Sequence, residues 1–288
     1  MFDKIYKSLL KKILEEGYQY NDPNRKDTYR KEIFHTEISY LYEKYPSLYC
    51  KKTFFKPAVG ELLVFLQGKT DVRDYWKYNV NFWDKDVFRF NRLTEEEFIV
   101  ARKEVLPSSK YNTGKIYPYQ YAKQYHVFDN FKANPLRTDL IINSWNIHDL
   151  KEMCLIPCHY SFQLLGSNES FAIVWNQRST DVLLGTPMNI QFYYLMGKIL
   201  EWWSGYKFSG VIANLNKVHL YDNQIEFAKK IVEVEDIESN SILELNIPTH
   251  LKTHSFEDFV KSLHPNMFKL ENYKYLLSEK IEMKTYTN

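Results

Sequence analysis

Hydrophobic and polar positions follow two different periods along this chain, and together they predict both helices and strands. Apolar residues recur every three or four positions over residues 4–16, with lysines and glutamates between them, which predicts an amphipathic helix. The apolar run from Pro57 to Gly68 predicts a second helix, since it starts with proline and stops at glycine. Residues 187–203 predict a buried helix, because polar residues interrupt this apolar segment too often for a membrane span.

Shorter segments between these helices have the composition or the alternation of β-strands. The strands are expected at 32–40, 140–145, after Cys158, 170–178 and 210–221. The last sixty residues are expected to hold short strands and loops, and the charged segment 94–104 predicts a helix in a surface insertion near 90–112. No linker, composition break or internal repeat divides the chain, so the pattern predicts a single domain of the α/β (α+β) class over residues 1–288.

Composition and charge narrow the classes of function. Hydrophobic residues make up 44% and charged residues 26%, as in ordinary soluble proteins, and the net charge of +2 argues against a broad nucleic-acid surface. The three cysteines form neither a disulfide framework nor a zinc-finger spacing, and the N-terminus carries no apolar run of signal-peptide type. We therefore expect a cytoplasmic protein with reduced thiols, without a metal site and without a membrane or nucleic-acid partner.

One cysteine is a candidate nucleophile. Cys158 lies between Pro157 and His159 at the start of a predicted strand, so its backbone is restrained and a basic ring stands beside it. A thiol in such a place can act as a nucleophile. The alternative is a buried strand cysteine with a packing role, which is the commoner case for an isolated cysteine.

Further polar residues occur at predicted strand ends and helix starts, and each has an ordinary explanation. Arg178 can be a surface arginine, Asp181 a helix cap, and Asn189 a residue of a first helical turn. His219 can be a core histidine, although it shares one strand face with Tyr221, two residues further on.

Taken together and in this order, these motifs resemble the thymidylate synthase family. The resemblance runs from about Ile5 to Phe259, and its most specific part is the block from Gln177 to Asn189. It rests on these stretches: Glu61-Leu-Leu-Val-Phe-Leu-Gln-Gly68, Asn79-Val-Asn-Phe-Trp83-Asp84, Gly114-Lys-Ile-Tyr117, Ser144-Trp145-Asn146, Pro157-Cys158-His159, Gln177-Arg178-Ser179-Thr-Asp181-Val-Leu-Leu-Gly185-Thr-Pro187-Met-Asn189 and His219-Leu-Tyr221. It implies the fold of that family, a large mixed β-sheet flanked by helices.

The resemblance also implies a reaction. A one-carbon unit passes from 5,10-methylenetetrahydrofolate, the co-substrate, to C5 of dUMP, and Cys158 adds to C6 to make C5 nucleophilic. Arg178 helps to ionise the thiol and binds the nucleotide phosphate. Asn189 reads the O4 and N3–H edge of uracil, since an amide offers one acceptor and one donor type. Asparagine at this place argues for dUMP, because members that act on dCMP tend to carry aspartate there.

The remaining roles come from the same resemblance. Glu61 takes part in a water-mediated proton relay, and Tyr117 assists removal of the C5 proton. Further contacts with the nucleotide are implied for Arg25, Arg137, Ser179, Asp181, His219 and Tyr221, the last two with the 3′-hydroxyl of the deoxyribose. Contacts with the folate are implied for Lys51, Trp83, Leu155, Asp181 and Gly185. A homodimer is implied as well, because members of the family complete the active site across a sheet-on-sheet interface.

The chain departs from the family pattern at the phosphate site and at the C-terminus. Thr138 and Asp139 stand where two adjacent arginines are usual, with Arg137 one step earlier, and Lys217 replaces an aspartate. The tail 260–288 lacks the usual closing segment, which excludes water from the site in this family. A dUMP hydroxymethylase, in which water replaces hydride as in some viral relatives, is therefore an alternative to methylation. A binding homologue without catalysis is a third reading, disfavoured because a pure binder needs no thiol.

Overall fold

A seven-stranded mixed sheet forms the centre of the computed structural model, which describes residues 2–22, 28–101, 103, 107–237, 239–279 and 281. The strand order is β1-β2-β7-β5-β4-β3, and β6 pairs with β7 off this path. The strands of the main sheet are β1 (Tyr18–Asn21), β2 (Tyr29–Tyr40), β3 (Ile141–Asn143), β4 (His159–Gly166), β5 (Ser170–Gln177), β6 (Thr180–Asp181) and β7 (Lys207–Tyr221). Parallel pairing of β5 and β6 with β7, beside antiparallel pairs elsewhere, makes the sheet mixed and confirms the expected fold class.

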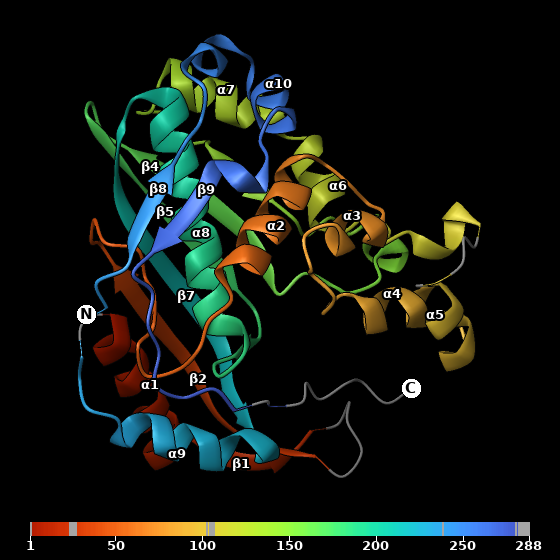
Figure 1. Ribbon diagram of the computed structural model, residues 1–288, viewed down its shortest axis with the longest axis vertical. Helices are drawn as coiled ribbons and strands as arrows, with labels where there is room; N and C mark the ends of the chain where they lie inside the picture. Colours follow the sequence, from red (N-terminus) through yellow and green to blue (C-terminus); the bar gives the residue numbers. More distant parts are fainter. Residues whose placement is uncertain are drawn as a thin grey trace.

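Helices flank this sheet (Figure 1), and two further strands pair antiparallel in a separate two-stranded sheet. These strands are β8 (Ile242–Leu245) and β9 (Phe268–Glu271), with α10 (Phe256–Lys261) between them in the chain. The helices are α1 (Phe2–Glu16), α2 (Phe55–Leu66), α3 (Val72–Trp76), α4 (Asp84–Phe90), α5 (Glu95–Ala101), α6 (Tyr117–Ala122), α7 (Tyr125–Ala133), α8 (Gly185–Ser204), α9 (Ile225–Glu233) and α10 (Phe256–Lys261). None of these helices, within the described ranges, is both long and apolar enough to cross a membrane.

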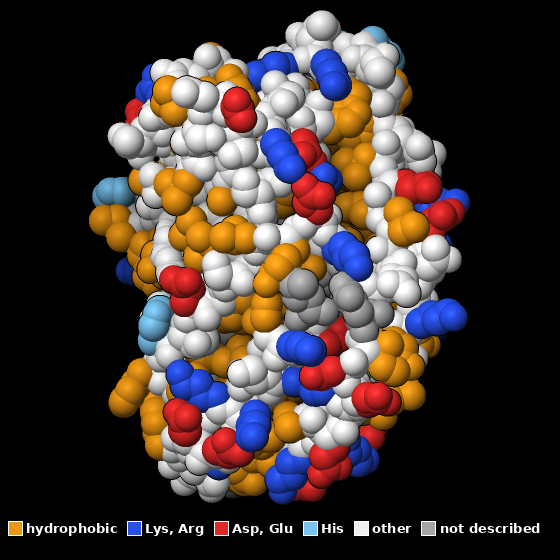
Figure 2. All heavy atoms as spheres, turned by 90° about the vertical axis from the view of Figure 1, so that its left-hand side faces the viewer, with side chains coloured by type: hydrophobic (Ala, Val, Ile, Leu, Met, Phe, Trp, Pro, Cys, Tyr) orange, Lys and Arg blue, Asp and Glu red, His pale blue; other side chains and the backbone are white. Residues whose placement is uncertain are grey.

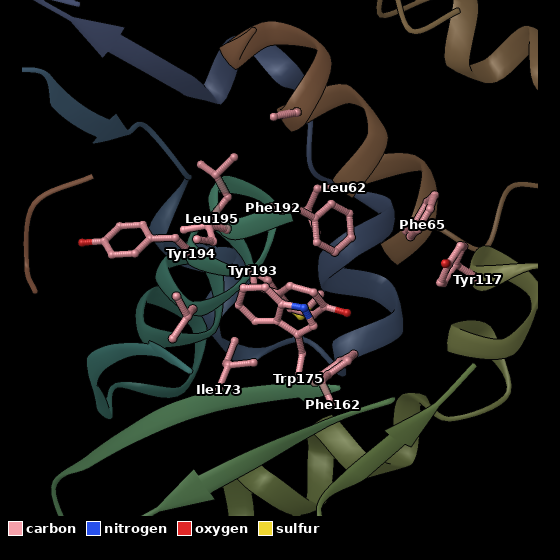
Figure 3. Close-up of a cluster of buried hydrophobic side chains, with 14 of the residues drawn as sticks. Leu62, Phe65, Tyr117, Phe162, Ile173, Trp175, Phe192, Tyr193, Tyr194 and Leu195 are labelled. Carbon is pink, nitrogen blue, oxygen red and sulfur yellow. The ribbon is translucent and has the colours of Figure 1, made fainter. Parts of the chain in front are cut away.

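The long helix α8 packs between the sheet and α2, and its buried position was expected from its apolar run. Trp175 of β5 stacks on Tyr193 of α8, with ring centroids 4.6 Å apart. Phe65 of α2 meets Phe192 of α8 at 5.3 Å and stacks on Tyr117 of α6 at 4.8 Å (Figure 3). These aromatic contacts fix α6 and α8 against each other, and the two helices carry residues of the candidate site.

Charged side chains of both signs lie on the face shown in Figure 2, mostly towards its lower end, where Figure 1 places α1 and α9. Hydrophobic side chains occupy several separate groups higher on the same face (Figure 2). The mixture of signs agrees with the net charge of +2. On this face, positive side chains of the described residues are interspersed with negative ones.

One expectation about the C-terminal part was wrong. The last sixty residues contain the helix α10 and most of α9, and not only short strands and loops. α10 has six residues, too few for a periodic pattern to be read, and it forms with a serine cap: Ser255 Oγ accepts the backbone N–H of Asp258 at 3.2 Å. The expected helix in the charged segment 94–104 is present as α5, and residues 102 and 104 lie outside the described residues.

Candidate active site

Cys158 directly precedes β4 and is held by its backbone on both sides. Its N–H donates to the hydroxyl of Tyr117 at 2.7 Å, and its carbonyl accepts the backbone N–H of Arg178 at 2.9 Å. The residue is partly exposed, whereas Cys50 and Cys154 are buried, and burial raises the pKa of both of their thiols. Cys158 is therefore the thiol that a substrate can reach, and Cys154 has a packing role.

The side chain of Arg178 forms hydrogen bonds with the loop that precedes Cys158. Its Nε donates to the carbonyl of Pro157 at 2.9 Å, and its Nη2 donates to the carbonyl of Ile156 at 3.0 Å. The guanidinium carbon lies 6.0 Å from the ring centroid of Trp145. The fork of the guanidinium thus fixes the backbone just before the nucleophile and keeps a positive charge beside it.

His159 is a half-buried neighbour of Cys158. Its ring stacks on Tyr117, with centroids 4.5 Å apart, and its Nδ1 lies 3.0 Å from the hydroxyl of Tyr193. Burial lowers the pKa of this histidine to about 3, so the ring is neutral at physiological pH and a weak base.

Glu61 and Trp83 form a pair beside the aromatic cluster. The indole Nε1 of Trp83 donates to Oε1 of Glu61 at 2.8 Å, and Trp83 packs edge-on against Tyr117 at 6.0 Å. Burial raises the pKa of Glu61 to about 7, and the hydrogen bond from Trp83 partly opposes this rise. A carboxyl group with such a pKa exchanges protons readily near neutrality, as a relay requires.

The side-chain amide of Gln177 orients Asn189, and sequence reasoning missed this role. Gln177 Oε1 accepts hydrogen bonds from Asn189 Nδ2 at 3.1 Å and from Trp175 Nε1 at 3.3 Å. Its Nε2 donates to the carbonyl of Ser179 at 3.0 Å, so the amide has one orientation. Asn189 is left with its oxygen available among the described residues. The only signal in the sequence was the position of Gln177 directly before Arg178.

Asp181 and Gly185 lie at the start of α8. The carboxylate of Asp181 accepts the backbone N–H of Leu184 and the side-chain Nε2 of Gln224, both at 2.9 Å. Asp181 thus fixes the chain just before α8, but it is not the helix cap that its ordinary explanation proposed, because Leu184 is at the cap position and α8 has no side-chain cap bond. A Cβ at Gly185 would meet Asn189 Nδ2 and Asp181 Cβ at 3.8 Å, which is ordinary van der Waals contact, so a small side chain would fit there without a clash.

Lys51 is turned into the protein. Its ammonium donates to the carbonyl of Leu183, and burial lowers the pKa of this lysine to about 8. Leu155 lies partly buried against the core. Of the residues expected to contact the folate, Leu155 lies three positions before Cys158 in the chain, and Trp83 packs against Tyr117, whose hydroxyl contacts Cys158. Lys51 lies instead beside the entry to α8.

His219 and Tyr221 lie side by side at the end of β7, as their spacing predicted. Their ring centroids are 4.9 Å apart in an edge-on arrangement, and both side chains are buried. Nδ1 of His219 lies 2.6 Å from the carbonyl of Lys217, while Nε2 is buried without a hydrogen-bond partner among the described residues. Desolvation lowers the pKa of His219. The neutral ring therefore has one nitrogen whose hydrogen-bonding capacity the described residues do not use.

The expected phosphate ligands are less closely gathered. Arg137 is exposed and forms a two-point ion pair with Asp139, Nε to Oδ1 at 2.9 Å and Nη2 to Oδ2 at 2.6 Å. Arg25 lies outside the described residues. Ser179 follows Arg178 and is half-buried. Within the described part of one chain, Arg178 is the cation placed next to Cys158.

Comparisons with known proteins agree with this geometry. The family model for thymidylate synthase matches residues 4–286. A thymidylate synthase of Brachyspira hyodysenteriae is 31% identical over 96% of this chain and 98% of its own, and that of Enterobacteria phage T4 is 28% identical over 94% and 96%. The structure of thermostable thymidylate synthase A from Bacillus subtilis aligns with a TM-score of 0.79 over 99% of both chains, at 24% identity.

Proposed function

Because this chain belongs to the thymidylate synthase family, we propose that Cys158 is the nucleophile of its reaction. The reaction is the transfer of a one-carbon unit from the co-substrate 5,10-methylenetetrahydrofolate to C5 of dUMP, which gives dTMP and dihydrofolate. The folate supplies both the carbon and the hydride. The protein has to activate C5 of the pyrimidine, to manage the C5 proton and to keep water out.

The thiolate of Cys158 adds to C6 of dUMP, and the electron pair of the C5–C6 double bond moves to C5 and O4. C5 then attacks the one-carbon unit, and loss of the C5 proton breaks the bond between this carbon and the folate nitrogen, which leaves an exocyclic methylene on C5 and tetrahydrofolate. Hydride transfer from tetrahydrofolate to this methylene expels the thiolate from C6 and gives dTMP and dihydrofolate. The positive charge of Arg178 beside the thiol favours its ionised form. Asn189, oriented by Gln177, presents its amide to the edge of uracil where charge develops.

Proton transfer falls to Tyr117 and Glu61 in this proposal. The hydroxyl of Tyr117 touches the backbone of Cys158, so it lies close to the bond that forms. Glu61, with a pKa of about 7, delivers and accepts protons through water. Trp83 fixes the direction of the Glu61 carboxyl and offers its ring to the folate, together with Leu155.

The observation that supports the role of Cys158 best is its partly exposed thiol between the Tyr117 hydroxyl and the Arg178 fork. Cys158→Ser is expected to abolish tritium release from dUMP labelled at C5, while binding of dUMP is retained. The matched control is Cys154→Ser, four residues away and buried, which should keep the release. Tritium release by the Cys158→Ser variant would remove this residue from its role.

Methylation is the favoured outcome over hydroxymethylation, since the relatives reported above carry the name thymidylate synthase. Mass spectrometry of the product formed from dUMP and methylenetetrahydrofolate tests this directly. dTMP with an equal amount of dihydrofolate is expected. 5-Hydroxymethyl-dUMP without dihydrofolate would contradict it.

The remaining contacts stay proposals drawn from the family. For the nucleotide they are Arg25, Arg137, Ser179, Asp181, His219 and Tyr221, and for the folate Lys51, Asp181 and Gly185. The buried Nε2 of His219, which has no hydrogen-bond partner among the described residues, supports the first group. We also propose a cytoplasmic protein whose 288 residues form one catalytic domain, with a surface insertion near 90–112 and an atypical C-terminal tail over 260–288.

A homodimer is proposed across the face of the sheet that points away from α8. Asn176 and Asn214 lie next to each other in register there, and Asn214 Nδ2 donates to Asn176 Oδ1 at 3.0 Å. Ile141 and Leu165 on neighbouring strands are 46% and 45% exposed, an apolar surface that a second copy would bury. Val174→Arg on this face is expected to give monomers in sedimentation, whereas Ile237→Arg outside it should not.

A further inference from the structure

Lys217 has an unusual backbone conformation inside β7. Its φ is +47°, in the left-handed region that residues with a Cβ seldom adopt, and yet it lies within a long strand. Strand pairing with β2 resumes on both sides, at Asn216 with His35 and at Val218 with Ile33. Such a conformation persists only where the surroundings hold it in place.

The ion pair between the side chain of Lys217 and Glu32 stabilises this backbone conformation. The ammonium of Lys217 lies 2.9 Å from Oε1 of Glu32, which is fully buried on the paired strand β2. The same carboxylate accepts hydrogen bonds from the hydroxyls of Tyr18 at 2.6 Å and Tyr20 at 2.8 Å. The ammonium also lies 5.9 Å from the ring centroid of Phe34. Lys217 is thus anchored on a carboxylate whose own position is fixed by strand β1.

The backbone of Lys217 acts on His219. The carbonyl of Lys217 lies 2.6 Å from Nδ1 of His219, and since a carbonyl can only accept, Nδ1 is the nitrogen that carries the proton. Burial keeps the ring neutral, so Nε2 carries none and is an acceptor. This acceptor is buried without a partner among the described residues, and a buried acceptor calls for a donor.

We propose that Lys217 is a positioning residue that makes His219 specific for a hydroxyl donor of the substrate. Its ammonium, anchored on Glu32, holds its carbonyl on Nδ1 and thereby presents Nε2 as a fixed acceptor. This rests on the proposed function, because dUMP carries one sugar hydroxyl, on C3′. A nucleotide whose sugar lacks that hydroxyl leaves Nε2 without a donor, so the enzyme should use this nucleotide less efficiently than dUMP.

The test compares dUMP with 2′,3′-dideoxyuridine 5′-monophosphate, which lacks only the 3′-hydroxyl. The native enzyme is expected to prefer dUMP, as judged by the ratio of the two kcat/KM values. In Lys217→Met this ratio should fall roughly 3- to 10-fold, which corresponds to the loss of one hydrogen bond. The fall should come from a lower kcat/KM for dUMP, while kcat/KM for the dideoxy nucleotide stays the same. Lys217→Arg keeps a cation at Glu32 and should restore the preference.

Two further variants separate anchoring from general damage. Lys217→Gly adopts a positive φ easily but has no ammonium, so it should lose the preference while remaining folded. Lys207→Met removes the exposed ion pair with Glu43 at the other end of β7 and should leave the ratio unchanged. The proposal is overturned if Lys217→Gly keeps the native ratio, or if Lys217→Met loses activity equally with both nucleotides. Absence of any dUMP turnover in the native enzyme would instead contradict the proposed function.

Discussion

The hydroxyl of Tyr117 accepts a hydrogen bond from the backbone N–H of Cys158 at 2.7 Å. The two residues are 41 positions apart in the chain and come from α6 and from the loop before β4. Tyr117 is itself fixed by stacking on Phe65 and on His159. The position of the thiol therefore depends on the aromatic core, and substitutions in that core are expected to change the rate of the reaction at Cys158.

Removal of the Tyr117 hydroxyl is the direct test of this coupling. Tyr117→Phe leaves a buried N–H without its acceptor, so the free energy of unfolding is expected to fall by about 1–3 kcal/mol. The rate of tritium release from C5-labelled dUMP should fall as well, because the thiol loses its support. Tyr119→Phe, on the same helix, removes a hydroxyl that makes no hydrogen bond with the described residues. If both variants behave alike in denaturation and in tritium release, the coupling is wrong.

The carboxyl group of Glu61 makes stability depend on pH. Burial raises its pKa from 4.5 to about 7 in the folded protein, so between these values the folded state binds more protons than the unfolded chain. The free energy of unfolding should therefore decrease as the pH rises from about 4.5 to 7 and then level off. Glu61→Gln lacks this dependence and should gain about 3 kcal/mol relative to the native protein between pH 4 and pH 8. Urea denaturation at the two pH values measures the difference, and an equal effect at both would contradict the assignment.

Trp83 tunes the same carboxyl group. Its indole N–H bonds to the ionised form and lowers the pKa of Glu61, against the effect of burial. Trp83→Phe keeps an aromatic ring without the donor, so the pKa of Glu61 should rise further. The pH at which kcat/KM shows the ionisation of this group is expected to move upwards, by about 1 unit for the loss of one such hydrogen bond. Trp76→Phe, which removes the 2.7 Å bond to Asp84, is the matched control and should not move the profile.

Arg178 is expected to be irreplaceable by lysine. A lysine keeps the charge but cannot donate to the carbonyls of Pro157 and Ile156 in one fixed geometry. Arg178→Lys should reduce kcat/KM for dUMP roughly 10- to 100-fold, the worth of one charge-assisted hydrogen bond. It should also slow alkylation of Cys158 by iodoacetamide, followed by mass spectrometry. Arg73→Lys, at an ion pair with Asp71 on the surface, provides the comparison and should change neither measurement by more than about twofold.

Much of the fold was readable from the sequence where an element is long. The apolar periods of α1, α2 and α8 extend over twelve residues or more, so their elements and their burial were predicted. α10 was missed because six residues hold too little of any period. The strands β5 and β7 were predicted, but their parallel pairing was not, because pairing joins segments that are distant in the chain.

The sequence by itself determined the family, because the order and spacing of the motifs around Cys158 and Asn189 identify it, and with the family came the residues that we propose for the site. Only the tertiary structure decided what several of these side chains do. In the folded chain, Arg178 donates to the loop before the thiol, and Gln177 orients Asn189. Both carboxylate oxygens of Asp181 accept hydrogen bonds at the entry to α8. The tertiary structure also joined the carbonyl of Lys217 to His219. The physical reason is that motif spacing fixes residue types along the chain, whereas the hydrogen-bond partners of a side chain depend on strand register and on the elements packed against it.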